Sequence, residues 1–166
     1  DNPAAPAIEF VPRDRNMQLF SAFLQDEIAV VEDRFAVTVG SKFEHNDFSG
    51  FEIQPSIRLA YTPTKKQTIW TAVSRAVRTP TRIEVDWNVP PFLNAESRDL
   101  FKSEEVIAYE LGYRVNMMKK ISYDVVVYYN SYDRLRSIEN LPGGPFFRNE
   151  FEGDAYGVEL TQNYQP

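Results

Sequence analysis

Residues 51–63 read FEIQPSIRLAYTP, and apolar and polar side chains alternate along this stretch almost without interruption. The apolar side chains share one parity: Phe51, Ile53, Ile57, Leu59 and Tyr61. The polar side chains share the other: Glu52, Gln54, Ser56 and Arg58. Successive side chains of a β-strand point to opposite faces, so the stretch predicts a strand with one apolar and one polar face. The apolar face is either the core of a soluble sandwich or a surface that touches membrane hydrocarbon.

The same alternation recurs along most of the chain and predicts an all-β, antiparallel up-and-down meander of about seven long strands. The predicted strands are 16–31, 35–44, 51–63, 68–77, 104–115, 121–132 and a last one from about residue 155. Segment 68–77 alternates poorly, and its faces stay unassigned. Pro55 lies on the apolar parity in mid-strand, where its missing amide hydrogen predicts a β-bulge.

The connections differ in length at the two ends of the predicted meander. Every odd-numbered connection is short, whereas the others grow to about 78–103 and 134–154. Outer-membrane barrels combine short periplasmic turns with long extracellular loops, so both long regions are expected to be extracellular. Residues 1–15 are expected to be the remainder of another such loop.

Composition excludes several classes of function. The net charge is -6 with no basic stripe, which argues against a nucleic-acid partner. Cysteine is absent and His45 is the one histidine, which removes thiolate and two-histidine metal sites. No nucleophile motif or isolated carboxylate pair stands out, so no catalytic residue, metal site or cofactor is predicted. Glu44, His45 and Asp47 are adjacent metal-ligand types, but a solvated turn explains them better.

Strand length, polar-face charge and aromatic placement favour a membrane barrel. The predicted strands reach about ten residues, enough to cross a bilayer at a tilt, whereas soluble strands average about five or six. Charged side chains fill the polar faces, as an aqueous lumen requires. Tyrosine and tryptophan recur near predicted strand ends, as an interfacial girdle would place them: Tyr61, Trp70, Tyr113, Tyr132 and Tyr156.

Seven segments, taken in order, resemble the β-barrel of TonB-dependent outer-membrane receptors. They are LFSAFLQDEIAV, FAVTVGSKFEH, FEIQPSIRLAYTPT, TIWTAVSRAVRTPT, KSEEVIAYELGYR, DVVVYYNSYDRL and GVEL. No single motif is specific, but their order and spacing together cover about residues 16–161.

The resemblance implies that residues 1–166 are a partial segment of a 22-stranded transmembrane barrel in a Gram-negative outer membrane. Such receptors bind a scarce solute such as a ferric siderophore, haem or cobalamin and import it with energy relayed by TonB. The expected partners are therefore outer-membrane lipid, the rest of the barrel with its plug domain, the TonB complex and a small-molecule or metal-chelate ligand. No plug domain is recognised within the chain, so the segment by itself is not expected to transport.

Candidate ligand-binding residues lie where the strands meet the long connections. Arg75, Arg78 and Arg82 cluster at the first one, and guanidinium groups suit carboxylates and metal-chelating oxygens. Lumen-lining or surface charge is the competing explanation. Four aromatic residues of the two long connections are candidates for stacking on a ligand: Trp87, Phe92, Phe146 and Phe147. Packing within the loops is the competing explanation for them.

Two other functions stay open at this point. One is a smaller outer-membrane pore or adhesin, and the other is a soluble β-sandwich that binds a ligand. Under the barrel hypothesis, an isolated segment would have unpaired strand edges and a large apolar face, so it is expected to self-associate.

Overall fold

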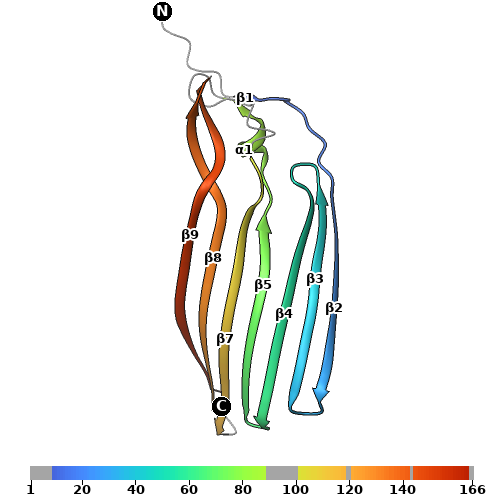
Figure 1. Cartoon of the computed structure of the whole chain (residues 1–166), viewed down its shortest axis with the longest axis vertical. Helices are drawn as coiled ribbons and strands as arrows, with labels where there is room; N and C mark the ends of the chain where they lie inside the picture. Colours follow the sequence, from blue (N-terminus) through green and yellow to red (C-terminus); the bar gives the residue numbers. More distant parts are fainter. Residues whose placement is uncertain (1–8, 89–100, 119–120, 143, 165–166) are drawn as a thin grey trace, which may run out of the picture.

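A computed structural model of the chain describes residues 9–88, 101–118, 121–142 and 144–164. Seven strands form one antiparallel sheet in chain order, β2-β3-β4-β5-β7-β8-β9 (Figure 1). Their bounds are β2 Leu19–Val31, β3 Phe35–Asn46, β4 Gly50–Thr64, β5 Gln67–Arg78, β7 Glu104–Met118, β8 Ile121–Leu141 and β9 Gly144–Tyr164. The remaining elements are β1 Glu9–Phe10, α1 Arg82–Asp86 and β6 Trp87–Asn88. The predicted up-and-down meander is confirmed.

The strands continue further than predicted at the C-terminal end. The region 134–154, predicted as a long loop, is almost entirely strand: β8 continues to Leu141, and β9 begins at Gly144. We call residues 134–141 and 144–154 the outer hairpin. The β8–β9 ladder shifts register on either side of Leu135, between Tyr132 and Leu135 and between Leu135 and Ser137. Beyond these shifts it pairs Ile138 with Phe147. The prediction of irregular structure there is wrong, because the two arms pair with each other as an antiparallel ladder up to Leu141 and Gly144.

The two ends of the sheet differ as predicted, although one of the two predicted long connections is strand rather than loop. The β2–β3 and β4–β5 turns lie at one end of the sheet, drawn at the bottom of Figure 1, together with the end of β7 and the start of β8. The β3–β4 turn, α1 and the outer hairpin lie at the opposite end. We call this the long-connection end. The N-terminal segment also reaches this end, where β1 pairs with β6.

The sheet has one apolar and one polar face across its full width. A row of directly opposed residues crosses the apolar face at the level of Ile57: Asp26, Val39, Ile57, Val73, Tyr109, Tyr129 and Tyr156. The next row crosses the polar face: Glu27, Thr38, Arg58, Ala72, Glu110, Tyr128 and Gly157. Asp26, on the edge strand β2, is a charged exception in the apolar row. The register also assigns β5, which the sequence left open: Ile69 and Val73 lie on the apolar face.

The apolar face has no second layer among the described residues. Its exposed large side chains range from Val73 at 38% to Tyr156 at 81%. The buried apolar side chains are few and include Phe101, Phe146 and Phe147 at the long-connection end. A soluble sandwich would cover this face with another sheet, so the sandwich alternative does not fit. None of the described helices is long and apolar enough to cross a bilayer.

Pro55 does not create the predicted bulge. The β3–β4 register runs through the Ser41–Pro55 pair without a shift. The β4–β5 ladder instead ends at the adjacent pair, Ser56 with Ser74. Because the pairing with β5 stops beside the proline, its missing donor is accommodated by separating two strands rather than by inserting a residue.

Candidate functional site

The separation of β4 from β5 creates a polar gap at the long-connection end, and side chains bridge it. Arg75 of β5 donates a hydrogen bond through Nη1 to the backbone oxygen of Ile53 in β4. The Gln54 side-chain oxygen accepts a hydrogen bond from the Val77 amide at 3.3 Å. Side chains thus replace the backbone ladder where Pro55 ends it.

Arg75, the first predicted ligand-binding arginine, is already surrounded by carboxylates. Its Nη2 lies 2.6 Å from a Glu105 oxygen and 3.8 Å from a Glu52 oxygen. Arg134 of β8 contacts the same Glu105 oxygen. Two guanidinium groups and two carboxylates therefore form a cluster with equal numbers of positive and negative charges. The charge of Arg75 is compensated by carboxylates of this chain.

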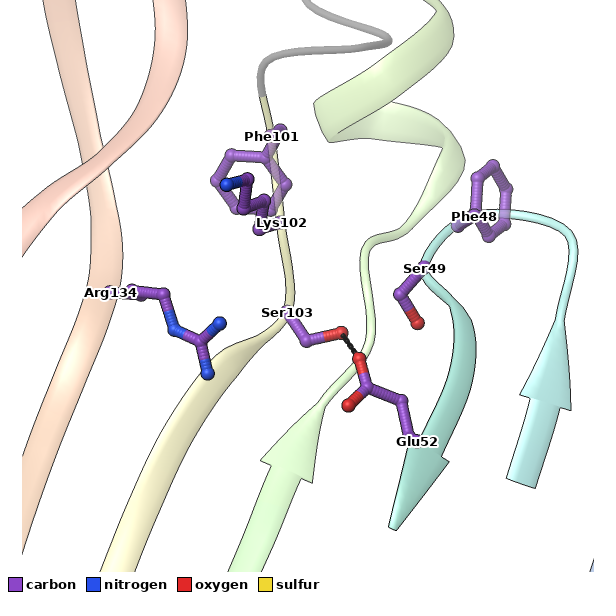
Figure 2. A pocket seen from close by; sticks show the side chains of 7 residues that line it. All are labelled: Phe48, Ser49, Glu52, Phe101, Lys102, Ser103 and Arg134. Atoms are coloured by element: carbon purple, nitrogen blue, oxygen red, sulfur yellow. Dashed lines mark hydrogen bonds between the residues drawn. The ribbon is translucent and has the colours of Figure 1, made fainter. Parts of the chain in front are cut away.

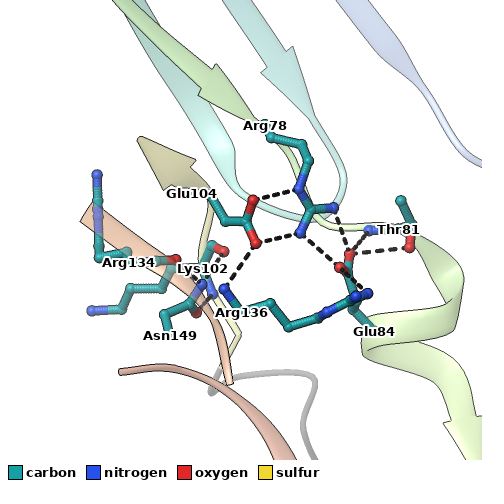
Figure 3. A network of polar contacts seen from close by, with 8 residues as sticks. All are labelled: Arg78, Thr81, Glu84, Lys102, Glu104, Arg134, Arg136 and Asn149. Atoms are coloured by element: carbon teal, nitrogen blue, oxygen red, sulfur yellow. Dashed lines mark hydrogen bonds and ion pairs between the residues drawn. The ribbon is translucent and has the colours of Figure 1, made fainter. Parts of the chain in front are cut away.

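Arg78, the second candidate, lies at the centre of a larger network (Figure 3). Its guanidinium contacts Glu104 at 2.6 Å and Glu84 at 2.7 Å. Glu84 also accepts hydrogen bonds from the Thr81 amide at 2.9 Å and from Arg136 of the outer hairpin at 3.3 Å. The Thr81–Glu84 pair is a capping box that begins α1.

The buried position of Glu84 affects the titration of its carboxyl group. Burial by itself would raise the pKa, because it disfavours the charged form. Hydrogen bonds from Arg78 and Thr81 outweigh that effect, so the pKa of Glu84 lies below its ordinary value of 4.5. The carboxylate is therefore charged at neutral pH and pairs with the guanidinium groups around it.

Arg82, the third candidate, binds the N-terminal segment. It donates hydrogen bonds to Asp86 at 3.2 Å and to the Pro12 carbonyl at 2.7 Å. Its guanidinium carbon also lies 4.7 Å above the centre of the Phe10 ring. The second Asp86 oxygen accepts from Arg15 at 2.7 Å. Like the other two arginines, Arg82 is held by groups of this chain.

Aromatic candidates from the two long connections pack on one another. Phe101 and Phe147 are buried and meet edge to face with ring centres 6.4 Å apart. Trp87 packs against this pair, and Phe146 is buried nearby in sequence. Phe92 lies outside the described residues. The packing explanation therefore accounts for Trp87 and Phe147, and ligand stacking stays a prediction for the four aromatic candidates.

A pocket of about 360 Å³ opens at the long-connection end, lined by residues that the sequence analysis did not select. Figure 2 shows its lining: Phe48, Ser49, Glu52, Phe101, Lys102, Ser103 and Arg134. The Ser103 hydroxyl donates to Glu52 at 2.6 Å, which orders one wall. Two aromatic rings and groups of both charges suit a polar ligand with a planar part. No local signal marks this set, because its members come from three separate segments, 48–52, 101–103 and 134.

The β3–β4 turn that carries Phe48 and Ser49 is fixed by its own hydrogen bonds. The Asn46 side-chain oxygen accepts from the Phe48 amide at 2.9 Å and from the Ser49 amide at 2.8 Å. Gly50 follows with a φ of 74°, a conformation that glycine adopts without steric cost. An Asx turn and a glycine thus set the pocket wall before any ligand is present.

The polar face carries a second depression, of about 530 Å³, in the middle of the sheet. Small residues of β3, β4 and β5 form its floor: Ala36, Ala60 and Ala72. Next to it the Arg58 guanidinium stacks over the Trp70 ring at 4.6 Å. Trp70 therefore lies on the polar face, and its predicted place in an apolar-face girdle is wrong, because it alternates with Ile69 and Val73 of the apolar face and pairs with Ala60 and Gly112 of the polar face.

The three adjacent metal-ligand types near the β3–β4 turn do not converge. Glu44 is buried and pairs with Lys42 at 2.7 Å, whereas the neighbouring His45 points to the opposite face of the strand. Asp47 accepts a hydrogen bond from the Gln18 amide at 2.8 Å. Across the described parts of the chain, no group of three or more such residues is arranged to hold a metal ion.

Comparisons with known proteins agree with the architecture. A family model described as TonB dependent receptor-like, beta-barrel matches residues 1–165. A search of curated proteins finds no match.

Solved structures share the fold at low identity. A mutant of the ferric enterobactin receptor of Pseudomonas aeruginosa in complex with enterobactin is 17% identical, with a TM-score of 0.72 over 87% of this chain and 24% of that one. The siderophore receptor PirA of Acinetobacter baumannii is 15% identical, with a TM-score of 0.67 over 89% of this chain and 26% of that one. The FrpB iron transporter of Neisseria meningitidis is 12% identical, with a TM-score of 0.67 over 90% of this chain and 24% of that one. The chain thus spans about a quarter of each of these structures.

Proposed function

This chain belongs to the TonB-dependent receptor β-barrel family, and we propose that it forms part of the wall of an outer-membrane receptor that imports a scarce solute. The solute class we propose is a ferric siderophore, haem or cobalamin, taken up with energy from the TonB complex. The observation that supports this proposal is the match over residues 1–165 together with the shared fold of siderophore and iron receptors. The open sheet is consistent with a segment of a larger barrel.

The placement of exposed aromatic residues supports a membrane position for the apolar face. On β4, Phe51 and Tyr61 bracket the apolar residues and are ten positions apart. At a rise of about 3.4 Å per residue and a tilt of about 40°, that interval covers about 26 Å of membrane thickness. An apolar band of about 25 Å is typical of outer-membrane barrels.

Both aromatic boundaries also cross the sheet diagonally in the same sense. At the first boundary, Tyr156 on β9 lies level with Ile57 of β4, which is six positions after Phe51. At the second boundary, Tyr164 on β9 lies four positions beyond the residue that is level with Tyr61. Over four strand spacings of about 4.8 Å, shifts of four to six residues correspond to a strand tilt of about 35–45°. Barrel strands have this tilt, so the aromatic pattern supports a bilayer around this face.

We propose that ligand contacts occur at the long-connection end, on the extracellular side. The pocket between Phe48 and Arg134 supports this location, since it combines aromatic and charged groups on an ordered wall. Arg75, Arg78 and Arg82 stay proposed contacts, but each would have to exchange a carboxylate partner for a ligand. Lys102 and Arg134 line the pocket directly, and Arg134 also pairs there with Glu105.

The function is tested in a Gram-negative host that lacks its own iron and cobalamin receptors. We expect the complete receptor containing this chain to restore TonB-dependent uptake of at least one ferric siderophore, haem or cobalamin. Uptake that persists without TonB would instead favour a passive pore, and no uptake or binding of any of these solutes would overturn the proposed solute class.

The proposed pocket is tested with two arginine variants of the same receptor. Arg134→Ala should weaken ligand binding about tenfold or more, because it removes a charged hydrogen-bond donor from the lining. Arg148→Ala is the matched control, since the Arg148 side chain lies outside the pocket lining and pairs within its own strand, with Glu150 at 3.3 Å. Equal affinities for both variants would move the ligand site away from this pocket.

A further inference from the structure

The short helix α1 carries two acidic side chains that are almost fully buried. The Glu84 side chain is 1% exposed and that of Asp86 is 0% exposed. Burying a carboxylate costs free energy unless charged or polar partners compensate. Both residues lie in the connection between β5 and β7, outside the sheet, so the strand pattern does not explain them. Their partners come from segments far apart in the chain.

Glu84 connects α1 to the end of β5 and to the outer hairpin. One Glu84 oxygen receives Arg78 at 2.7 Å and Arg136 at 3.3 Å. The Arg136 backbone amide donates a hydrogen bond to Glu104 at 2.9 Å, and Glu104 also accepts a hydrogen bond from Arg78 (Figure 3). Arg136 thus attaches the hairpin to α1 through its side chain, and to the first residue of β7 through its backbone amide.

Asp86 connects α1 to the N-terminal segment. Its carboxylate receives Arg15 at 2.7 Å, and its backbone oxygen receives the Val11 amide at 2.8 Å. The β1–β6 pairing continues this attachment one residue further along, with Phe10 opposite Trp87. Asp86 therefore joins segments separated by about seventy residues of chain, as the Arg15–Asp86 separation of 71 shows.

An apolar contact supports the attachment to the outer hairpin. Trp87, directly after α1, packs against Phe101 and Phe147. The Arg136 guanidinium lies 5.7 Å from the centre of the Phe147 ring, so the ionic and apolar contacts are adjacent.

We propose that residues 9–15, the segment 79–88 and the outer hairpin form one rigid cap with two separate joints. Glu84 is the joint to the hairpin, and Asp86 is the joint to the N-terminal segment. The cap moves as a single body, so any opening of the long-connection end displaces all three segments together. This inference concerns mechanical coupling and holds whichever solute the receptor binds.

Hydrogen–deuterium exchange on the complete receptor in detergent micelles tests the two joints separately. Glu84→Gln and Asp86→Asn keep side-chain shape and remove the charge. Because a charged hydrogen bond is lost, we expect exchange in 79–88 to rise about 10- to 100-fold in both variants. Glu84→Gln should also raise exchange in the outer hairpin more than in 9–15, and Asp86→Asn should show the reverse preference. Glu150→Gln, at an exposed hairpin carboxylate, should leave 79–88 unchanged.

The pattern of exchange decides the proposal. Changes confined to 79–88 in both variants would show that the three segments move independently and would overturn the cap. Equal effects of both variants on the hairpin and on 9–15 would overturn the separate joints. If Glu84→Gln does not fold, Arg136→Gln breaks the same joint from the hairpin side and is read by the same criteria. Strands β2–β5 serve as the internal reference in every case.

Discussion

Replacing Gly112 by alanine should disturb a close contact between two neighbouring strands on the polar face. Gly112 of β7 lies directly opposite Trp70 of β5. A Cβ atom added there would lie 2.2 Å from the Trp70 ring, whereas ordinary contact begins near 3.4 Å. The ring must therefore move by more than about 1 Å, away from a position where Arg58 also holds it at 4.6 Å.

The magnitude follows from three opposing effects. Overpacking costs about 1–3 kcal/mol, and losing the Arg58–Trp70 stack costs about 0.5–1 kcal/mol more. Reduced chain entropy in the unfolded state returns about 0.4–1 kcal/mol on replacing glycine by alanine. We therefore expect Gly112→Ala to lower the free energy of unfolding by about 1–3 kcal/mol.

Denaturant unfolding of the complete receptor in detergent micelles measures this loss. Gly153→Ala is the matched control, because a Cβ there meets nothing within 4 Å; we expect a change within about 0.5 kcal/mol. A double-mutant cycle with Trp70→Ala isolates the cause, since alanine at position 112 should cost little once the ring is gone. An undiminished cost of Gly112→Ala in the Trp70→Ala background would refute the steric argument.

Three further predictions concern the long-connection end and the sheet edges. Folding lowers the pKa of Glu84, so the contribution of this carboxylate to stability is present above its ordinary pKa of 4.5 and is lost as pH falls through the lower folded pKa. A fluorophore attached to Ile83→Cys should therefore report loosening of α1 only below about pH 4.5. Loosening between pH 5 and 7 would contradict this. Phe147→Ala should lower the free energy of unfolding by about 3–5 kcal/mol if the cluster with Phe101 and Trp87 unfolds with the barrel, and by much less if the cap frays first; comparing global unfolding with protease cleavage at the hairpin separates these outcomes. The isolated 166-residue chain has free edges at β2 and β9 and an exposed apolar face, so sedimentation in detergent-free buffer should show multimers, and a stable monomer would argue against lipid contact.

Sequence by itself determined the strands, their two faces and the ends at which they turn. Alternation with a period of two is a local property, and it is legible in β3, β4 and β7 without knowledge of their neighbours. It failed for β5, where Trp70 is a large aromatic residue on the polar face. The reason is cross-strand: Trp70 covers the side-chain-free surface of Gly112, a partner 42 positions away that only pairing reveals.

Tertiary structure alone decided what the charged and aromatic residues at the long-connection end do. Arg78 was a candidate ligand contact from its place in the chain, but register and the α1 turn bring Glu84 and Glu104 to it from 6 and 26 positions away, and bring Arg136 to Glu84 from 52 positions away. Tertiary structure also decided that residues 134–141 are strand, because they pair with β9, and the local sequence pattern does not predict this pairing. Side-chain alternation is set by each strand alone, whereas charge partners and hairpin length depend on which segments the fold places side by side.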